Sequence, residues 1–216
     1  MDRVRIKICG LMRPQDIDMV NEVCPDIAGF ILASGRRRTV TPEQMRELTG
    51  RLKPEIRSAA VFLDQDIRWI ADLAEGGLMD IIQLHGHEGN EEIRYLRSRT
   101  DKTVIKAFRI DTAENIRRAE DSEADLVLLD HGAGGTGQAW DWSLLTGMKR
   151  PFILAGGLDS ENVQEAVSKT HPFGVDVSSG VETDGCKDRE KILRFVRTVR
   201  GCCVVGSKYA DGVLER

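Results

Sequence analysis

Two glycine-containing segments in the last third of the chain have the composition of a phosphate site. Residues 155–158 read Ala-Gly-Gly-Leu, residues 178–182 read Ser-Ser-Gly-Val-Glu, and each segment follows a short apolar run. Exposed backbone N–H groups at the start of a helix carry partial positive charge, and glycine lets an oxyanion approach the chain closely. The two segments together predict a phosphate clamp.

Four of the short apolar runs end in polar side chains that fall on one face of the run. These side chains are Cys9, Gln83 with His85, Asp130, and Asp176 with Ser178. Each of these residues also has a purely structural explanation, because a buried cysteine is often inert, a carboxyl group can cap a helix and a histidine can be a hydrogen-bonded structural residue. If Ile6 and Ile8 face a layer of helices, Cys9 faces the opposite way. The agreement among four runs favours a site.

The apolar runs have the length and composition of strands, and helical patterns separate most of them. The eight runs lie at residues 4–9, 27–32, 58–63, 80–84, 103–108, 126–130, 151–155 and 173–178. Pro14 begins one helical stretch at a first-turn position, and Thr41 is the expected N-cap of another. Apolar stripes of helical period lie at 67–74, 93–96 and 192–199. The stretch 142–148 allows barely two turns.

Alternating strands and helices predict parallel βαβ units, and eight such units predict a closed (β/α)8 TIM barrel of the α/β class. A doubly wound open sheet is the structural alternative, but it would leave edge strands to protect. In a barrel the loops after the seventh and eighth strands form the recurrent phosphate site, and both glycine segments fall there. We expect a single barrel domain over residues 1–200, followed by an extension over residues 201–216 with no assigned role.

Composition narrows the class of protein. The chain has 216 residues, of which 41% are hydrophobic, and a net charge of -4, so nothing attracts it globally to nucleic acid or to an anionic membrane. No apolar run approaches the roughly 20 residues that a membrane span needs, and the charged N-terminus does not resemble a secretion signal. The five cysteines have neither disulfide-framework nor zinc-site spacing. A cytoplasmic location is expected.

With these residues in place, the chain resembles the phosphoribosylanthranilate isomerase family of tryptophan biosynthesis over roughly residues 4–200. The matching segments are Lys-Ile-Cys-Gly-Leu at 7–11, Gln-Leu-His-Gly at 83–86, Leu-Asp at 129–130 leading through Gly-Gly-Thr-Gly to Trp-Asp-Trp at 140–142, Leu-Ala-Gly-Gly-Leu at 154–158, and the run at 174–182. Any one of them is weak evidence. Their order, with each at an expected strand end, makes the resemblance strong.

The resemblance implies an Amadori rearrangement of N-(5-phosphoribosyl)anthranilate to 1-(2-carboxyphenylamino)-1-deoxyribulose 5-phosphate, with no cofactor and no metal. Asp130 would be the general acid that protonates the ring oxygen of the sugar, and Cys9 the general base that removes the C2 proton. These residue types suit such roles, because a carboxyl group at an apolar strand end can have a raised pKa and a free cysteine titrates at about 8.5.

The resemblance also implies the substrate contacts. Arg38 would bind the anthranilate carboxylate, but its loop departs from the usual Ser-Pro-Arg run, so the choice among Arg36, Arg37 and Arg38 stays open. Gln83 and His85 would contact the substrate, and Asp176 would lie near the sugar hydroxyls. The phosphate would be held by Gly156, Gly157, Ser178, Ser179 and Gly180.

Two other functions are weighed against this one. A metal-assisted pentulose-phosphate epimerase could use His85, Asp130 and Asp176 as ligands, but the second strand supplies no further histidine. A degenerate barrel could instead act as a phosphometabolite sensor, although sensing alone needs no acid–base pair. The only expected partner is a small phosphorylated molecule, and the chain is expected to be a monomer or a homodimer.

Overall fold

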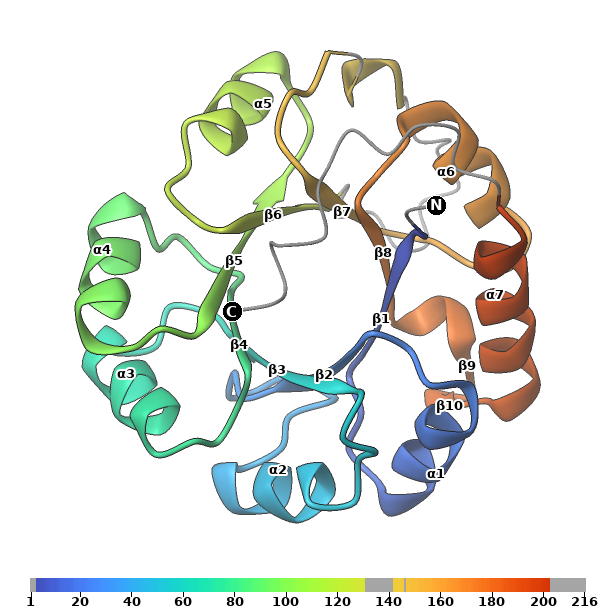
Figure 1. Cartoon of the computed structure of the whole chain (residues 1–216), viewed down its shortest axis with the longest axis horizontal. Coiled ribbons are helices and arrows are strands. Elements are labelled where there is room, and N and C mark those ends of the chain that lie inside the picture. Colours follow the sequence, from blue (N-terminus) through green and yellow to red (C-terminus); the bar gives the residue numbers. More distant parts are fainter. Residues whose placement is uncertain (1–2, 131–141, 146, 203–216) are drawn as a thin grey trace.

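Eight parallel strands form a closed ring with helices outside it in the computed structural model, which describes residues 3–130, 142–145 and 147–202 (Figure 1). The strands of the ring are β1 Arg5–Cys9, β2 Ile27–Ile31, β3 Arg57–Phe62, β4 Ile81–Leu84, β5 Thr103–Arg109, β6 Leu126–Asp130, β7 Phe152–Ala155 and β8 Gly174–Val177. Each predicted strand is present, with ends within one residue of the prediction. The predicted barrel is confirmed, and the open-sheet alternative is wrong.

Helices connect the strands on the outside of the ring. They are α1 Pro14–Val23, α2 Pro42–Thr49, α3 Ile67–Glu75, α4 Asn90–Arg99, α5 Ala113–Glu120, α6 Val163–Thr170 and α7 Arg189–Gly201, with the short 3-10 turns η1 Trp142–Leu145 and η2 Ser179–Val181. The predicted N-cap at Thr41 is confirmed, since its hydroxyl accepts a hydrogen bond from Gln44 N at 3.2 Å. The weak stretch at 142–148 forms only η1. No helix in the described part of the chain could cross a membrane.

The buried apolar residues form two clusters, and these clusters fix the direction in which each strand residue points. One contains Ile6 and Ile8 together with the apolar faces of the helices. The other lies inside the barrel and contains alternate strand residues such as Ile81, Leu128 and Ile153. Because side chains alternate along a strand, residues in phase with the second cluster face the barrel interior. Cys9 therefore points inward, as predicted.

Three aspartates fasten the N-terminal ends of the strands. Each stands directly before an even-numbered strand, and its carboxylate accepts a hydrogen bond from a backbone N–H of the preceding strand. The pairs are Asp26 with Ile6 N at 2.9 Å, Asp80 with Ser58 N at 2.8 Å and Asp125 with Val104 N at 2.8 Å. These bonds satisfy donors at the end of the barrel opposite the predicted site, and so they serve register and stability.

A short hairpin interrupts the chain between β8 and α7. Its strands are β9 Glu182–Thr183 and β10 Cys186–Lys187, which pair antiparallel. Asp188 follows the hairpin and caps α7 by accepting hydrogen bonds from the N–H groups of Glu190 and Lys191. The final helix ends at Gly201, so the predicted boundary near residue 200 stays a prediction, and residues 203–216 lie outside the described residues.

Candidate active site

One cavity of about 440 Å³ opens at the C-terminal ends of the strands, and every site residue predicted from the sequence lines it. These residues are Cys9, Arg38, Gln83, His85, Asp130, Gly156, Gly157, Asp176, Ser178, Ser179 and Gly180. β1 and β6, which carry Cys9 and Asp130, lie on different sides of the ring (Figure 1). A molecule in the cavity would therefore have the thiol and the carboxyl group on different flanks.

Cys9 lies at the end of β1 with 6% of its surface exposed. Lys7, two residues earlier on the same face, is opposite Asp176 in the β1–β8 register, and its Nζ lies 2.8 Å from Asp176 Oδ1. Burial raises the pKa of the Cys9 thiol, and the Lys7 ammonium opposes that shift. The thiol thus lies in a dry pocket beside a cation.

Gln83 and His85 lie on the same face of the β4 end, as the period of the strand requires. Gln83 Nε2 lies 3.1 Å from His85 Nδ1, and His85 Nε2 lies 3.5 Å from Asp130 Oδ2. If the Gln83 amide donates to Nδ1, neutral His85 carries its proton on Nε2, toward Asp130. Gln83 Oε1 is a buried acceptor with no hydrogen-bond partner among the described residues.

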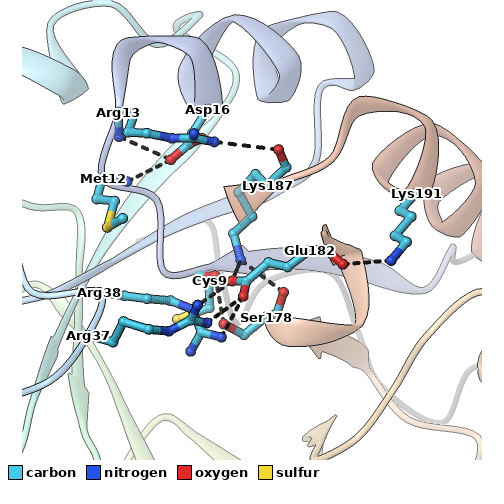
Figure 2. A network of polar contacts seen from close by, with 10 residues as sticks. All are labelled: Cys9, Met12, Arg13, Asp16, Arg37, Arg38, Ser178, Glu182, Lys187 and Lys191. Carbon is cyan, nitrogen blue, oxygen red and sulfur yellow. Dashed lines mark hydrogen bonds and ion pairs between the residues drawn. The ribbon is translucent and has the colours of Figure 1, made fainter. Parts of the chain in front are cut away.

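The buried carboxylate of Glu182 binds three cationic side chains at the rim of the cavity (Figure 2). Arg38 donates from Nε and Nη2 at 2.6 and 2.8 Å, Arg37 donates at 2.7 Å, and Lys187 Nζ donates at 2.8 Å. Lys191 binds the backbone oxygen of Glu182 instead. Although burial raises it, hydrogen bonds from Arg38 and Lys187 hold the pKa of Glu182 at about 2.

The two glycine segments pack against each other, and the contact tolerates no side chain. A Cβ on Gly180 would lie 1.9 Å from the Leu158 carbonyl oxygen and 2.9 Å from its carbonyl carbon. Gly156 and Gly157 both have a positive φ, of 93° and 65°, which glycine adopts without strain. The predicted phosphate residues are therefore brought together by backbone geometry that requires glycine.

The loop after β2 is fixed by another close approach. A Cβ on Gly10 would lie 2.5 Å from Arg38 Cδ, and Gly10 has a φ of 81°. Arg38 therefore lies against the backbone that follows Cys9. Arg36 lines the same cavity, but its guanidinium has no side-chain partner within residues 3–130, 142–145 and 147–202.

Three charged residues of the site were not assigned from the sequence: Lys7, Glu182 and Lys187. Strand alternation placed Lys7 on the face of Cys9, which was a usable signal. Glu182 lies in the matching segment at 174–182, but no role was predicted for it. Lys187 gave no signal, because its burial depends on the hairpin. The segment with glycines at 134, 135 and 137, and with Trp140 and Asp141, lies outside the described residues.

The metal alternative finds no donor set in the described ranges. No group of three or more histidine, cysteine or acidic side chains there is arranged to hold a metal ion. Of the ligands considered for an epimerase, Asp176 is paired with the Lys7 ammonium instead.

Comparison with known proteins identifies the family. Residues 6–198 match the family described as N-(5'-phosphoribosyl)anthranilate isomerase. The isomerase of that name from Caldanaerobacter subterraneus is 39% identical over 204 residues, covering 92% of this chain and 98% of its own. The solved phosphoribosylanthranilate isomerase of Thermotoga maritima has a TM-score of 0.84 at 34% identity, covering 92% and 99% of the two chains.

A further solved isomerase of this name was determined in complex with reduced 1-(o-carboxyphenylamino)-1-deoxyribulose 5-phosphate. It has a TM-score of 0.82 at 33% identity and covers 92% of this chain and 99% of its own. The family and the enzyme class predicted from the sequence are confirmed. The chain belongs to the N-(5'-phosphoribosyl)anthranilate isomerase family.

Proposed function

We propose that the chain catalyses the Amadori rearrangement of N-(5'-phosphoribosyl)anthranilate, with Asp130 as general acid and Cys9 as general base. The observation that carries the proposal is the shared cavity: a carboxyl group on β6, a thiol on β1 and two glycine loops all line one opening. A single sugar phosphate could meet all of them at once. Holding acid, base and substrate in one geometry is a large part of how such an enzyme accelerates its reaction.

The first step is the opening of the ribose ring. Asp130 donates its proton to the ring oxygen, the C1–O bond breaks, and the nitrogen lone pair forms a Schiff base with C1. His85 Nε2 lies 3.5 Å from the carboxyl group of Asp130 on the same rim. General acid catalysis of this kind contributes about 10²–10⁴-fold.

The second step transfers the C2 proton to the Cys9 sulfur. The electrons of the C–H bond form the C1–C2 double bond, and the iminium nitrogen becomes neutral, which gives an enolamine. Tautomerisation of the enolamine then yields the ketone. A thiolate suits this step because an ordinary cysteine thiol titrates at about 8.5, close to neutrality. The C2 hydrogen must therefore face β1.

Arg38 is the proposed contact for the anthranilate carboxylate. Glu182 occupies its Nε and one side of Nη2, so the other edge of the guanidinium, formed by Nη1 and Nη2, keeps donors for a second carboxylate. Gln83 Oε1, buried and lacking a partner among the described residues, is a ready acceptor for a donor group on the substrate. Asp176 would accept from a sugar hydroxyl while it keeps its pair with Lys7.

The phosphate would lie between the glycine loops after β7 and β8. Gly156, Gly157, Ser178, Ser179 and Gly180 line that part of the cavity. The related isomerase whose complex was solved binds a ligand with a phosphate group, which supports a phosphorylated substrate for this chain. Binding the phosphate far from C1 and C2 lets remote binding energy position the reacting carbons.

We also propose that the enzyme works in the cytoplasm as a monomer or a homodimer, without cofactor, nucleic acid or membrane partners. The net charge of -4 gives the chain no general attraction to nucleic acid or to an anionic membrane.

Turnover of freshly prepared phosphoribosylanthranilate tests the function. The substrate loses its fluorescence as it rearranges, so we expect a decay that depends on enzyme concentration. Binding without decay would support the sensor instead. Undiminished turnover after treatment with a chelator separates the isomerase from a metal-assisted epimerase.

A further inference from the structure

A buried ammonium group lies beside the proposed base. Lys7 has 1% of its side chain exposed, although lysine is among the residues least often fully buried. Its Nζ lies 2.8 Å from Asp176 Oδ1, and its charge acts on Cys9, which lies two residues further along the same face of β1. Burying an ammonium group is costly, and one carboxylate at the edge of a cavity offsets only part of that cost.

The charges around the thiol do not balance. Cys9 is faced by Lys7 from its own strand, by Asp176 from β8 and by Lys187 from the hairpin. Lys187 in turn binds Glu182, which also holds Arg37 and Arg38 (Figure 2). The cluster therefore contains four cationic side chains and two carboxylates. Such a surplus of positive charge favours anions, and the only titratable group of the cluster that is still neutral is the thiol of Cys9.

Lys7 is not suited to be the base itself. Although burial lowers it, the charges of Asp176 and Cys9 raise the pKa of Lys7 above its ordinary value, so the ammonium stays protonated at any working pH. For Cys9 the largest effect is burial, which raises its pKa, and the largest opposing effect is the charge of Lys7. Lys7 is thus a permanent positive charge that favours the ionised form of the Cys9 thiol.

We propose that Lys7 is a positioning residue of the reaction, whose ammonium group, anchored by Asp176 on the same inward face as Cys9, stabilises the thiolate form of Cys9 against the effect of burial. This inference rests on the proposed role of Cys9 as the base. Lys7 makes no step of its own. It acts through Cys9, by stabilising the negative charge that the sulfur carries before it accepts the C2 proton.

The test measures ionisation of the thiol rather than turnover. Cys24, Cys186, Cys202 and Cys203 are first replaced by serine, which leaves Cys9 as the only cysteine. The rate of alkylation by iodoacetamide is then measured against pH, and the midpoint of the profile gives the apparent pKa of Cys9. The midpoint is independent of how easily the reagent reaches the cavity.

Either single substitution would leave one buried charge of the pair alone, the Asp176 carboxylate or the Lys7 ammonium, and could unfold the barrel. Both partners are therefore replaced together, and the double variant Lys7→Met with Asp176→Asn is compared with the four-serine parent. Replacing both partners of a buried pair leaves no unpaired charge. The matched control is Lys106→Met with Glu88→Gln, which removes another buried lysine–carboxylate pair, with 5% and 4% of the side chains exposed.

We expect the Lys7→Met, Asp176→Asn variant to contain about threefold less thiolate at a given pH than the four-serine parent, or less still, because the charge of Lys7 acts on Cys9 more strongly than that of Asp176. The control pair should leave the midpoint at the value of the four-serine parent. Equal midpoints for the parent and the double variant would overturn the role of Lys7, and so would an equal shift in the control.

Turnover of Cys9→Ser separates this inference from the function on which it rests. Full turnover by that variant would refute Cys9 as the base, and with it the catalytic meaning of Lys7, whatever the alkylation profiles show. Loss of turnover by Cys9→Ser together with equal midpoints would refute Lys7 alone.

Discussion

Replacing Gly180 by alanine tests the contact between the two glycine loops. Gly180 does not have a positive φ, so alanine adds no backbone strain, and the effect of the substitution is the added methyl group. That group would lie 1.9 Å from the Leu158 oxygen, whereas such contacts below 3.0 Å are essentially never seen. The loops after β7 and β8 must therefore separate by about 1 Å, a displacement that costs on the order of 10²-fold when it misplaces a substrate.

The assay is steady-state turnover, with inhibition by inorganic phosphate measured in parallel. We expect kcat/KM to fall on the order of 10²-fold and phosphate to inhibit more weakly. Overpacking should also cost about 1–3 kcal/mol of stability, seen as a lower Tm. Gly50→Ala is the control, because its Cβ would make only contacts of 3.4 Å or more at the end of α2. Unchanged KM and unchanged phosphate inhibition in Gly180→Ala would refute the placement of the phosphate.

Three further substitutions separate binding, ionisation and stability. Arg38→Ala should raise KM much more than Arg36→Ala does, because Glu182 holds the guanidinium of Arg38, but not that of Arg36, in place for the substrate carboxylate. A larger rise in KM for Arg36→Ala would move the contact to Arg36. Because the folded-state pKa of Glu182 is about 2, its contribution to stability is present above its ordinary pKa of about 4.3 and is lost as pH falls toward 2. Glu182→Gln should therefore show a smaller drop in Tm than wild type across that window, and parallel Tm curves would count against the ion cluster. Asp80→Ala leaves the Ser58 N–H without its acceptor and should lower the free energy of unfolding, measured by denaturant titration, by about 1–3 kcal/mol. We expect kcat and KM to stay unchanged, and altered kinetics would contradict the assignment of stability to this end of the barrel and of catalysis to the other.

The strands and the residues at their ends could be predicted because each depends on local alternation. Cys9, Asp130 and Asp176 each end a short apolar run, and the period of a strand fixes their common direction once one face is assigned to the helices. Closure of the ring then brings distant segments of the chain to the same rim. No long-range information was needed beyond the count of strands.

The ion cluster could not be predicted, because it depends on contacts that no local pattern encodes. Glu182 meets Arg38 across 144 residues of sequence. Lys187 is buried where the β9–β10 hairpin brings its ammonium group to the Ser178 carbonyl, just after β8, and to the Glu182 carboxylate. The partner of Lys7 likewise follows from the β1–β8 register, which exists only in the closed barrel. The electrostatic setting of the thiol is therefore a property of the fold.

The most direct test of the account compares the turnover numbers of wild type, Cys9→Ser and Asp130→Asn with phosphoribosylanthranilate. Affinity for the reduced product analogue is measured on the same proteins to show that the cavity is intact. We expect turnover to fall at least about 10²-fold in each variant, with little change in affinity, because each lacks one proton-transfer group. Near-normal turnover by either variant would contradict the assignment of acid and base to the two sides of the cavity.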